Sequence, residues 1–239
     1  RTFQVYFQPI YSTVDNCYTN MEALVRLIDD NHGFIPPDEF IPIAEKNGDI
    51  LAIGEIVLEK VCSFIEEYHP EDFGIKAIHV NLSVVQCMQE NINIRLMNII
   101  DKYRIPHTLI DFEITETTAD NTSDTLIKIM QDFNSKGIHF SLDDFGTGYS
   151  NQTNIMRYPY SIVKIDKSMV WACDSNPKAF ISLKHTIAMI KDLEMKVLAE
   201  GVETENQREI LASIGVEYLQ GYYFSRPLPI SEVMEVIKN

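Results

Sequence analysis

Short runs of β-branched and aromatic residues alternate with longer amphipathic stretches along the whole chain. The short runs predict strands at residues 3–10, 18–27, 75–82, 109–115, 138–142, 161–165, 196–199 and 218–221. Between them, apolar residues recur at intervals of three and four, which predicts helices over residues 50–68, 92–103, 125–134, 179–193, 204–214 and 231–238. Such an alternation is typical of an α/β protein.

The number of predicted strands favours a closed barrel. A (β/α)8 TIM-like barrel has a typical length of about 250 residues, and this chain has 239. A doubly wound open sheet is the alternative. Residues 11–17 are too few for a crossover helix, so the first two strands are expected to be antiparallel, with one barrel strand near the N-terminus reversed.

The domain organisation is expected to be simple. No repeat, low-complexity tract or Gly/Ser linker interrupts the sequence, so we expect residues 1–239 to form a single domain. Because the chain begins with Arg1 rather than Met, we expect it to be a piece of a longer multidomain signalling protein.

Composition excludes several classes of protein. A net charge of −15 argues against a duplex nucleic-acid binder, which neutralises phosphates with Lys and Arg. The four cysteines contain no C-x-x-C pair, which suits neither a zinc site nor a disulfide scaffold and favours a cytoplasmic location. No apolar run approaches the roughly 20 residues of a membrane-spanning helix, so any membrane anchor is expected outside this domain.

Polar side chains stand at or just beyond the carboxyl end of nearly every predicted strand. In β/α barrels these ends form the rim where active sites are built. The residues are Glu22, Asn81, Glu113, Glu116, Asp143, Asp144, Lys164, Asp166, Glu200, Glu203 and Gln220. A single acid at a strand end is more often a helix N-cap or a surface residue, and Glu116 and Glu217 are as well explained that way. The coordinated set favours a functional site.

So many carboxylates at one rim would repel one another unless cations were present. Oxygen ligands without thiolates favour Mg²⁺ or Mn²⁺, and the adjacent Asp143 and Asp144 could hold two such ions. Paired ions are used for in-line displacement at phosphorus, which predicts metal-assisted phosphoester hydrolysis. Lys164 interrupts an apolar run, and its charge is less costly at the barrel mouth than in the helix layer.

Other catalytic motifs are missing from the sequence. Its six histidines form no H-E-x-x-H motif, which argues against a histidine metal site and leaves most of them as surface or satisfied core groups. No G-x-S-x-G elbow indicates a serine hydrolase. The Gly-Thr-Gly at residues 146–148 lacks the spacing of a phosphate-binding loop.

The motifs of this chain resemble those of the EAL domain family, the bacterial phosphodiesterases of cyclic di-GMP. The resemblance runs along the whole chain, through residues 7–10 (FQPI), 21–26 (MEALVR), 37–42 (PDEFIP), 80–83 (VNLS), 113–116 (EITE), 143–150 (DDFGTGYS), 163–166 (VKID), 199–204 (AEGVET) and 220–227 (QGYYFSRP). It implies a β/α barrel with one antiparallel strand, two Mg²⁺ or Mn²⁺ ions, and hydrolysis of cyclic di-GMP to linear pGpG. It also implies a homodimer, and a sensor or GGDEF-type domain elsewhere in the full-length protein.

The same resemblance implies roles for individual residues. Glu22, Asn81, Glu113 and Asp143 would hold one ion, while Asp143 and Asp144 would hold the second. Glu200 would be the general base or a further metal contact, with Lys164 touching the attacking water. Arg26 would pair with a substrate phosphate, Gln8 would lie near a guanine, and Glu203 and Gln220 would complete the site.

Three departures from the family pattern stand out. Leu27 replaces the usual Trp, and Val85 replaces the usual Arg. Residues 151–156 (NQTNIM) replace a Ser-Leu-x-x-Leu loop that supports the Asp pair and the dimer contact in the family. None removes a ligand, so an active phosphodiesterase is expected, and a non-catalytic cyclic di-GMP receptor that acts through partner domains is the alternative.

Overall fold

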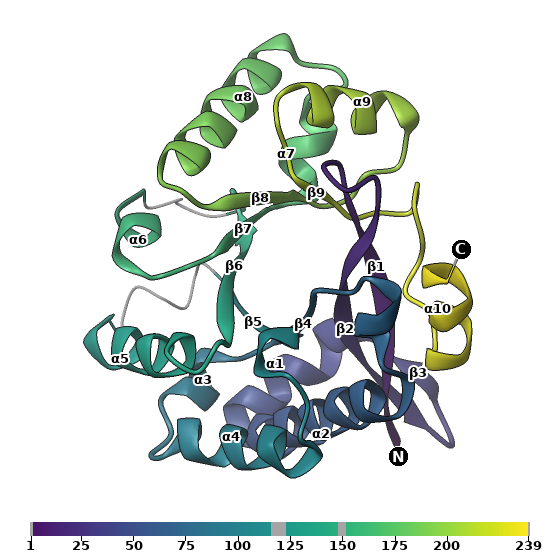
Figure 1. Ribbon diagram of the computed structural model, residues 1–239, viewed down its shortest axis with the longest axis vertical. Helices are drawn as coiled ribbons and strands as arrows, with labels where there is room; N and C mark the ends of the chain where they lie inside the picture. Colours follow the sequence, from purple (N-terminus) through teal and green to yellow (C-terminus); the bar gives the residue numbers. More distant parts are fainter. Residues whose placement is uncertain (1, 116–122, 148–151, 239) are drawn as a thin grey trace.

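A closed barrel with helices around it forms the centre of the protein (Figure 1). The computed structural model describes residues 2–115, 123–147 and 152–238. Within these ranges the sheet order is β1-β9-β8-β7-β6-β5-β4-β2-β3, and pairing of β1 with β2 closes eight of the strands into a ring. The barrel strands are β1 (Thr2–Ser12), β2 (Cys17–Asp29), β4 (Ala77–Asn81), β5 (Ile110–Thr115), β6 (His139–Phe145), β7 (Ile162–Ile165), β8 (Lys196–Ala199) and β9 (Tyr218–Leu219). The predicted barrel is confirmed.

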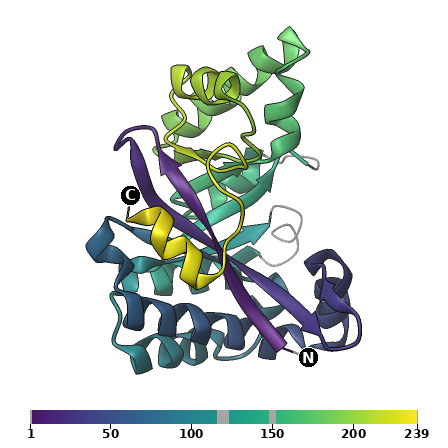
Figure 2. The ribbon, with the colours of Figure 1, turned by 90° about the vertical axis from the view of Figure 1, so that its right-hand side faces the viewer.

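Strand β1 is the reversed strand that the short first connection predicted. It pairs antiparallel with both β2 and β9, whereas β2 and β4–β9 run parallel. The β1–β2 hairpin is the longest ribbon of the barrel, and β3 (Gly33–Ile35) adds a short strand to β2 outside the ring (Figure 2). Helix α10 (Ile230–Ile237) packs against this hairpin.

The helices pack outside the strands. Besides α10 they are α1 (Pro37–Asn47), α2 (Ile50–Tyr68), α3 (Val84–Cys87), α4 (Ile92–Tyr103), α5 (Ser123–Asn134), α6 (Gln152–Arg157), α7 (Lys167–Ala172), α8 (Pro177–Asp192) and α9 (Glu205–Ser213), with 3-10 turns at Pro70–Phe73 and His107–Leu109. Helices α2 and α4 have the predicted bounds. Helix α9 begins with the capping box that its sequence indicates, because Thr204 accepts from the Gln207 backbone and the Gln207 side chain returns the bond.

The inner face of the barrel has a polar half and an apolar half. Successive residues of a strand point to opposite faces, so the residue two positions farther from the rim lies below each rim residue. On β2, β4, β5 and β6 these lower residues are polar and buried, and we call them the inner polar cluster: Asn20, His79, Asp111 and Ser141. On β1, β7, β8 and β9 they form a separate apolar cluster of Ile10, Ile162, Leu198 and Tyr218. The large hydrophobic core lies between the sheet and the helices.

Among the described residues, no helix combines the length and apolarity that crossing a membrane requires.

Candidate metal centre

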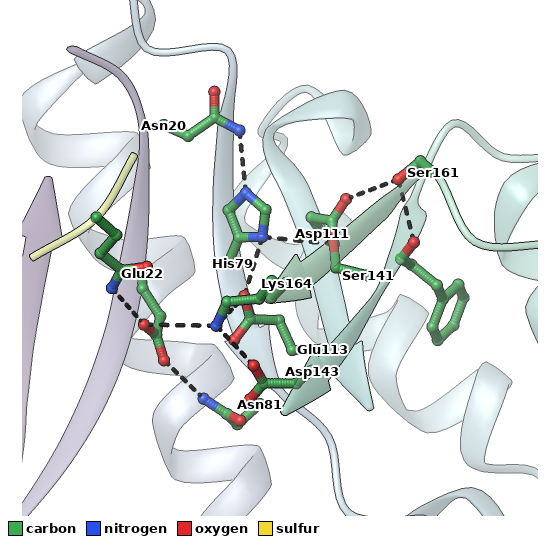
Figure 3. A network of polar contacts seen from close by, with 12 residues as sticks. Asn20, Glu22, His79, Asn81, Asp111, Glu113, Ser141, Asp143, Ser161 and Lys164 are labelled. Carbon is green, nitrogen blue, oxygen red and sulfur yellow. Dashed lines mark hydrogen bonds and ion pairs between the residues drawn. The ribbon is translucent and has the colours of Figure 1, made fainter. Parts of the chain in front are cut away.

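Lys164 lies at the centre of the rim, surrounded by carboxylates (Figure 3). Its side chain is fully buried, and Nζ lies 2.8 Å from Glu113, 3.0 Å from Asp143, 2.9 Å from Glu200 and 3.7 Å from Glu22. These acids come from β5, β6, the end of β8, and β2. The structure therefore places the predicted lysine at the barrel mouth and not in the helix layer.

The end of β6 has a local irregularity that accounts for its two adjacent acids. In a regular strand Asp143 and Asp144 would point to opposite faces. The pairing of β6 with β7 shifts register between Leu142 and Phe145, and Asp144 has a left-handed backbone with φ of 57°. Bulges of this kind redirect a side chain at the edge of a site. Both acids consequently line the same cavity.

Amide side chains hold Glu22 from two sides. Asn81 Nδ2 donates to one Glu22 oxygen at 3.2 Å, and Gln220 Nε2 donates to the other at 2.6 Å. Gln220 Nε2 also lies 3.2 Å from Gln8 Oε1, and Gln8 in turn donates to the Ser225 carbonyl. In this structure Gln220 therefore holds Glu22 in place, and Gln8 links Gln220 to the backbone at Ser225.

Two cavities flank the middle of β2. The larger, of about 540 Å³, is lined by proposed metal ligands and by Arg26. The smaller, of about 280 Å³, is lined by Glu200, Glu203, Trp171 and Tyr222 among others. Glu22 lines both cavities, so it stands between them.

The guanidinium of Arg26 stacks between two aromatic rings near the larger cavity. Its Cζ lies 5.6 Å from the Tyr6 ring centroid and 5.8 Å from that of Phe34. Partial burial lowers the pKa of Arg26, but a guanidinium stays charged at any physiological pH. The structure thus places the positive charge of Arg26 on the wall of the larger cavity, among its acidic side chains.

The excess of carboxylates over cations shifts the protonation of the site. Burial raises the pKa of Glu113 to about 7 and that of Glu200 to about 8, although Lys164 opposes both shifts. Burial and the charge of Asp143 also raise the pKa of Asp144. Burial alone would lower the pKa of Lys164, but the surrounding carboxylates raise it well above its usual value. Without further positive charge, part of this site therefore holds protons near neutral pH.

The donor set fits divalent cations. Glu113 Oε2 is buried and has no hydrogen-bond partner among the described residues, whereas Glu113 Oε1 and Asp143 Oδ1 face the Lys164 ammonium. Asp143, Asp144 and Glu200 each offer an oxygen within 4.8 Å of the others. Hard oxygen ligands of this kind suit Mg²⁺ or Mn²⁺. This grouping also brings Glu200 close enough to be a metal contact.

Other predicted rim residues lie apart from this centre. Glu203 is exposed at the smaller cavity, and Asp166 N-caps α7 by accepting from the Ser168 backbone at 2.8 Å. Glu217 has a structural role, because it accepts from the Val197 backbone and pairs with Lys191. Glu116 lies outside the described residues, as does part of the 151–156 loop.

His79 belongs to the site although the pattern of strand-end residues does not indicate it. It is fully buried below the rim, where Nδ1 lies 3.1 Å from Glu113 Oε1 and 3.7 Å from Asp111 Oδ1. One signal was present: polar residues two positions apart, His79 with Asn81 and Asp111 with Glu113, predict neighbours on one strand face. Only the closed barrel shows that both pairs face the same interior.

Comparisons with known proteins agree with this geometry. A sequence model of the EAL domain family matches residues 1–227. The signalling protein YkoW of Bacillus subtilis is 33% identical over 98% of this chain and 29% of its own length. MucR of Pseudomonas aeruginosa, a bifunctional diguanylate cyclase/cyclic di-GMP phosphodiesterase, is 34% identical over 98% of this chain and 34% of its own. The chain spans about a third of the length of these curated relatives.

The same fold occurs in solved structures. The MucR phosphodiesterase in complex with cyclic di-GMP has a TM-score of 0.90 at 32% identity, covering 97% of this chain and 94% of that one. Since 97% of the chain aligns, the likeness extends to the whole barrel, rim included.

Proposed function

The chain belongs to the EAL domain family, and we propose that it is a cyclic di-GMP phosphodiesterase that hydrolyses its substrate to linear pGpG. The observation that carries the proposal is the group of four carboxylates, from Glu22, Glu113, Asp143 and Glu200, that surrounds Lys164 beside two cavities. MucR, a relative of 34% identity, carries cyclic di-GMP phosphodiesterase in its name.

The proposed metal ligands are those that the family motifs assign. Glu22, Asn81, Glu113 and Asp143 would hold one ion, and Asp143 and Asp144 the second. When bound, Mg²⁺ or Mn²⁺ ions neutralise charge on a phosphate and make water more acidic. Glu113 Oε2, which is buried and has no hydrogen-bond partner among the described residues, supports this assignment.

The two cavities suit a substrate with two bases on either side of a charged centre. Arg26 lines the larger cavity and would pair with a phosphate through its planar fork. Gln8 and Gln220 line the smaller cavity, where they would contact the substrate or keep Glu22 in place. Glu22, shared by both cavities, would then lie beneath the ring of the dinucleotide.

Glu200 is the proposed general base. Its carboxylate lies 2.9 Å from Lys164 Nζ, so the two groups are close enough to contact the same water molecule. Cations nearby would lower the raised pKa of Glu200 and leave it ready to accept a proton. The water oxygen forms a bond to phosphorus and the bond from phosphorus to the 3′ oxygen breaks. Glu200 takes one proton of the water and later releases it to solvent, while the leaving 3′ oxygen takes a proton from solvent, which opens the ring to pGpG.

A titration in two stages tests the proposal. Purified protein is mixed with cyclic di-GMP in EDTA, where we expect binding without turnover, and Mg²⁺ or Mn²⁺ is then added, after which pGpG should accumulate. Tight binding with no product after either ion would favour the non-catalytic receptor. Absence of binding in both stages would contradict both readings.

A further inference from the structure

We infer that His79 is a positioning residue, which holds Glu113 so that one of its carboxylate oxygens stays free for a divalent cation (Figure 3). The inference rests on the metal centre of the proposed function and extends it by one layer into the barrel. It concerns how the ligand is oriented, and it assigns His79 no contact with substrate or metal.

The two oxygens of Glu113 have different surroundings. Oε1 lies 2.8 Å from Lys164 Nζ and 3.1 Å from His79 Nδ1, so two nitrogens fix its position. Oε2 is equally buried and has no hydrogen-bond partner among the described residues. A buried acceptor without a partner is costly unless something completes its coordination. The ligand is therefore held by one oxygen and open at the other.

Asn20 determines which nitrogen of His79 faces Glu113 as a donor. The Asn20 amide nitrogen lies 3.0 Å from His79 Nε2, and an amide nitrogen can only donate. A neutral imidazole that accepts this bond at Nε2 carries its proton on Nδ1, the atom that faces Glu113. The contact from the far side of the ring thus sets the tautomer that supports the ligand.

Asp111 fixes the imidazole from below. Its Oδ1 accepts from Ser141 at 2.6 Å and lies 3.7 Å from His79 Nδ1, while its Oδ2 lies 3.4 Å from Ser161 Oγ. These side chains come from β5, β6 and the residue before β7, so the sheet itself anchors the network. Rotation of His79 away from Glu113 would also move Nδ1 away from the buried Asp111 carboxyl group and leave that polar group with fewer contacts.

The position of the inner polar cluster matches the proposed ligands. Its four members lie directly below Glu22, Asn81, Glu113 and Asp143, the residues assigned to one ion. Below Gln8, Lys164, Glu200 and Gln220 the same layer is apolar. Metal-bound carboxylates and amides are commonly oriented by such outer contacts, and losing one weakens metal affinity by about 10–100-fold. The inner polar cluster therefore lies below those rim residues whose side chains would have to be oriented toward a metal ion.

Direct Mn²⁺ binding, measured by calorimetry without nucleotide, tests the inference. His79→Leu, which removes the donor, should bind Mn²⁺ about 10–100-fold more weakly. His79→Asn can return an N–H near the position of Nδ1 and should recover most of that loss. In steady-state assays His79→Leu should need more Mn²⁺ for half-maximal rate, with kcat largely restored at saturation.

Two further variants guard against misinterpretation. Ile10→Ala makes a cavity in the apolar half of the same layer, and should lower the melting temperature without weakening Mn²⁺ binding. If His79→Leu does not fold, Asn20→Ala replaces it in the test and is also expected to weaken Mn²⁺ binding. Unchanged Mn²⁺ affinity in His79→Leu or Asn20→Ala would overturn the inference about His79 and would not affect the proposed metal centre. A wild-type chain that bound no Mn²⁺ would overturn both the inference and the metal centre.

Discussion

Lys164 is a fully buried cation whose four carboxylate contacts come from four different elements of the barrel. Replacing it with Met keeps the volume and removes the positive charge that lies in contact with all four acids. Removing one partner of a buried ion pair destabilises a protein by about 3–5 kcal/mol. We expect Lys164→Met to lose roughly 3 kcal/mol in urea unfolding with EDTA, with protonation of the acids limiting the loss.

Divalent cations provide the check on this prediction. Because they supply the missing positive charge, saturating Mn²⁺ should reduce the stability difference between Lys164→Met and wild type. Turnover should remain low even then, since the ammonium is proposed to position the attacking water. Equal unfolding curves in EDTA would show that the ion pairs contribute nothing net.

Asp143 is the residue on which both proposed ions depend. Asp143→Asn keeps the shape and removes the charge, so we expect it to reduce turnover to background at any Mg²⁺ concentration. Asp192→Asn, on the exposed last turn of α8, makes the same chemical change away from the site and should keep wild-type kinetics. An active Asp143→Asn protein would sink the two-ion arrangement.

At the residue scale, the sequence indicated the rim well and the layer below it poorly. Acids at strand ends predict a site directly from the sequence, because β/α barrels build their active sites at those ends. His79 gave no such signal, because a lone histidine within a strand is more often a satisfied core group. Its place in the site depends on the register of β4 and β5, which sets His79 opposite Asp111.

Among the elements, the turn after β6 is the most constrained by the site. Gly146 has φ of +104°, and a Cβ built there would lie 2.2 Å from Met169 Sδ on α7. We expect Gly146→Ala to lower the melting temperature and to slow turnover, because the backbone next to Asp144 must shift. Gly74→Ala is the matched control, with φ of +91° and nothing within 4 Å.

The comparison separates two effects. Both alanines should cost about 1–2 kcal/mol for the left-handed backbone, and only Gly146→Ala should add a steric cost and a kinetic defect. A double variant with Met169→Ala should recover part of the extra loss. If the two single variants had equal stability and equal activity, packing of this turn against α7 would not matter.

Predictability of elements followed their length. Helices α2 and α4, of 19 and 12 residues, showed a full apolar period and were predicted to the residue. Helices α3, α6 and α7 have four to six residues, too few to show a period. Helix α1 contains Pro42 and exposes Ile43, so neither its composition nor its pattern indicated a helix.

At the scale of the whole molecule, the crowded carboxylates link stability to pH. In the metal-free protein the pKa of Glu113 is about 7 and that of Glu200 about 8, both above the usual 4.5. Between pH 5 and 8 the folded state therefore binds more protons than the unfolded state, so its stability falls as pH rises. We expect the melting temperature in EDTA to drop over this interval by an amount equivalent to ~2 kcal/mol or more.

Two controls belong to this prediction. Mn²⁺ should flatten the pH profile, because bound cations stabilise the charged carboxylates and so lower their pKa values. Substituting both Glu113 and Glu200 with Gln should flatten it without metal. A melting temperature that rose between pH 5 and 8 in EDTA would contradict the proposed charge balance.

The curated relatives are about three times as long as this chain, and one of them is bifunctional. We propose that the domain acts within a longer signalling protein, as a homodimer, beside a sensor or GGDEF-type domain. Analytical ultracentrifugation with and without cyclic di-GMP would measure the dimer, for which a constant monomer mass would count against the proposal.

The central claim is that the rim acids and Lys164 form a metal-dependent phosphodiesterase centre. Its most direct test is the steady-state conversion of cyclic di-GMP, followed by chromatography, with Mg²⁺, Mn²⁺ and EDTA in parallel. The account predicts pGpG as the product with at least one of the two ions and none in EDTA. Product formation that was unaffected by EDTA, or no product with either ion, would contradict it.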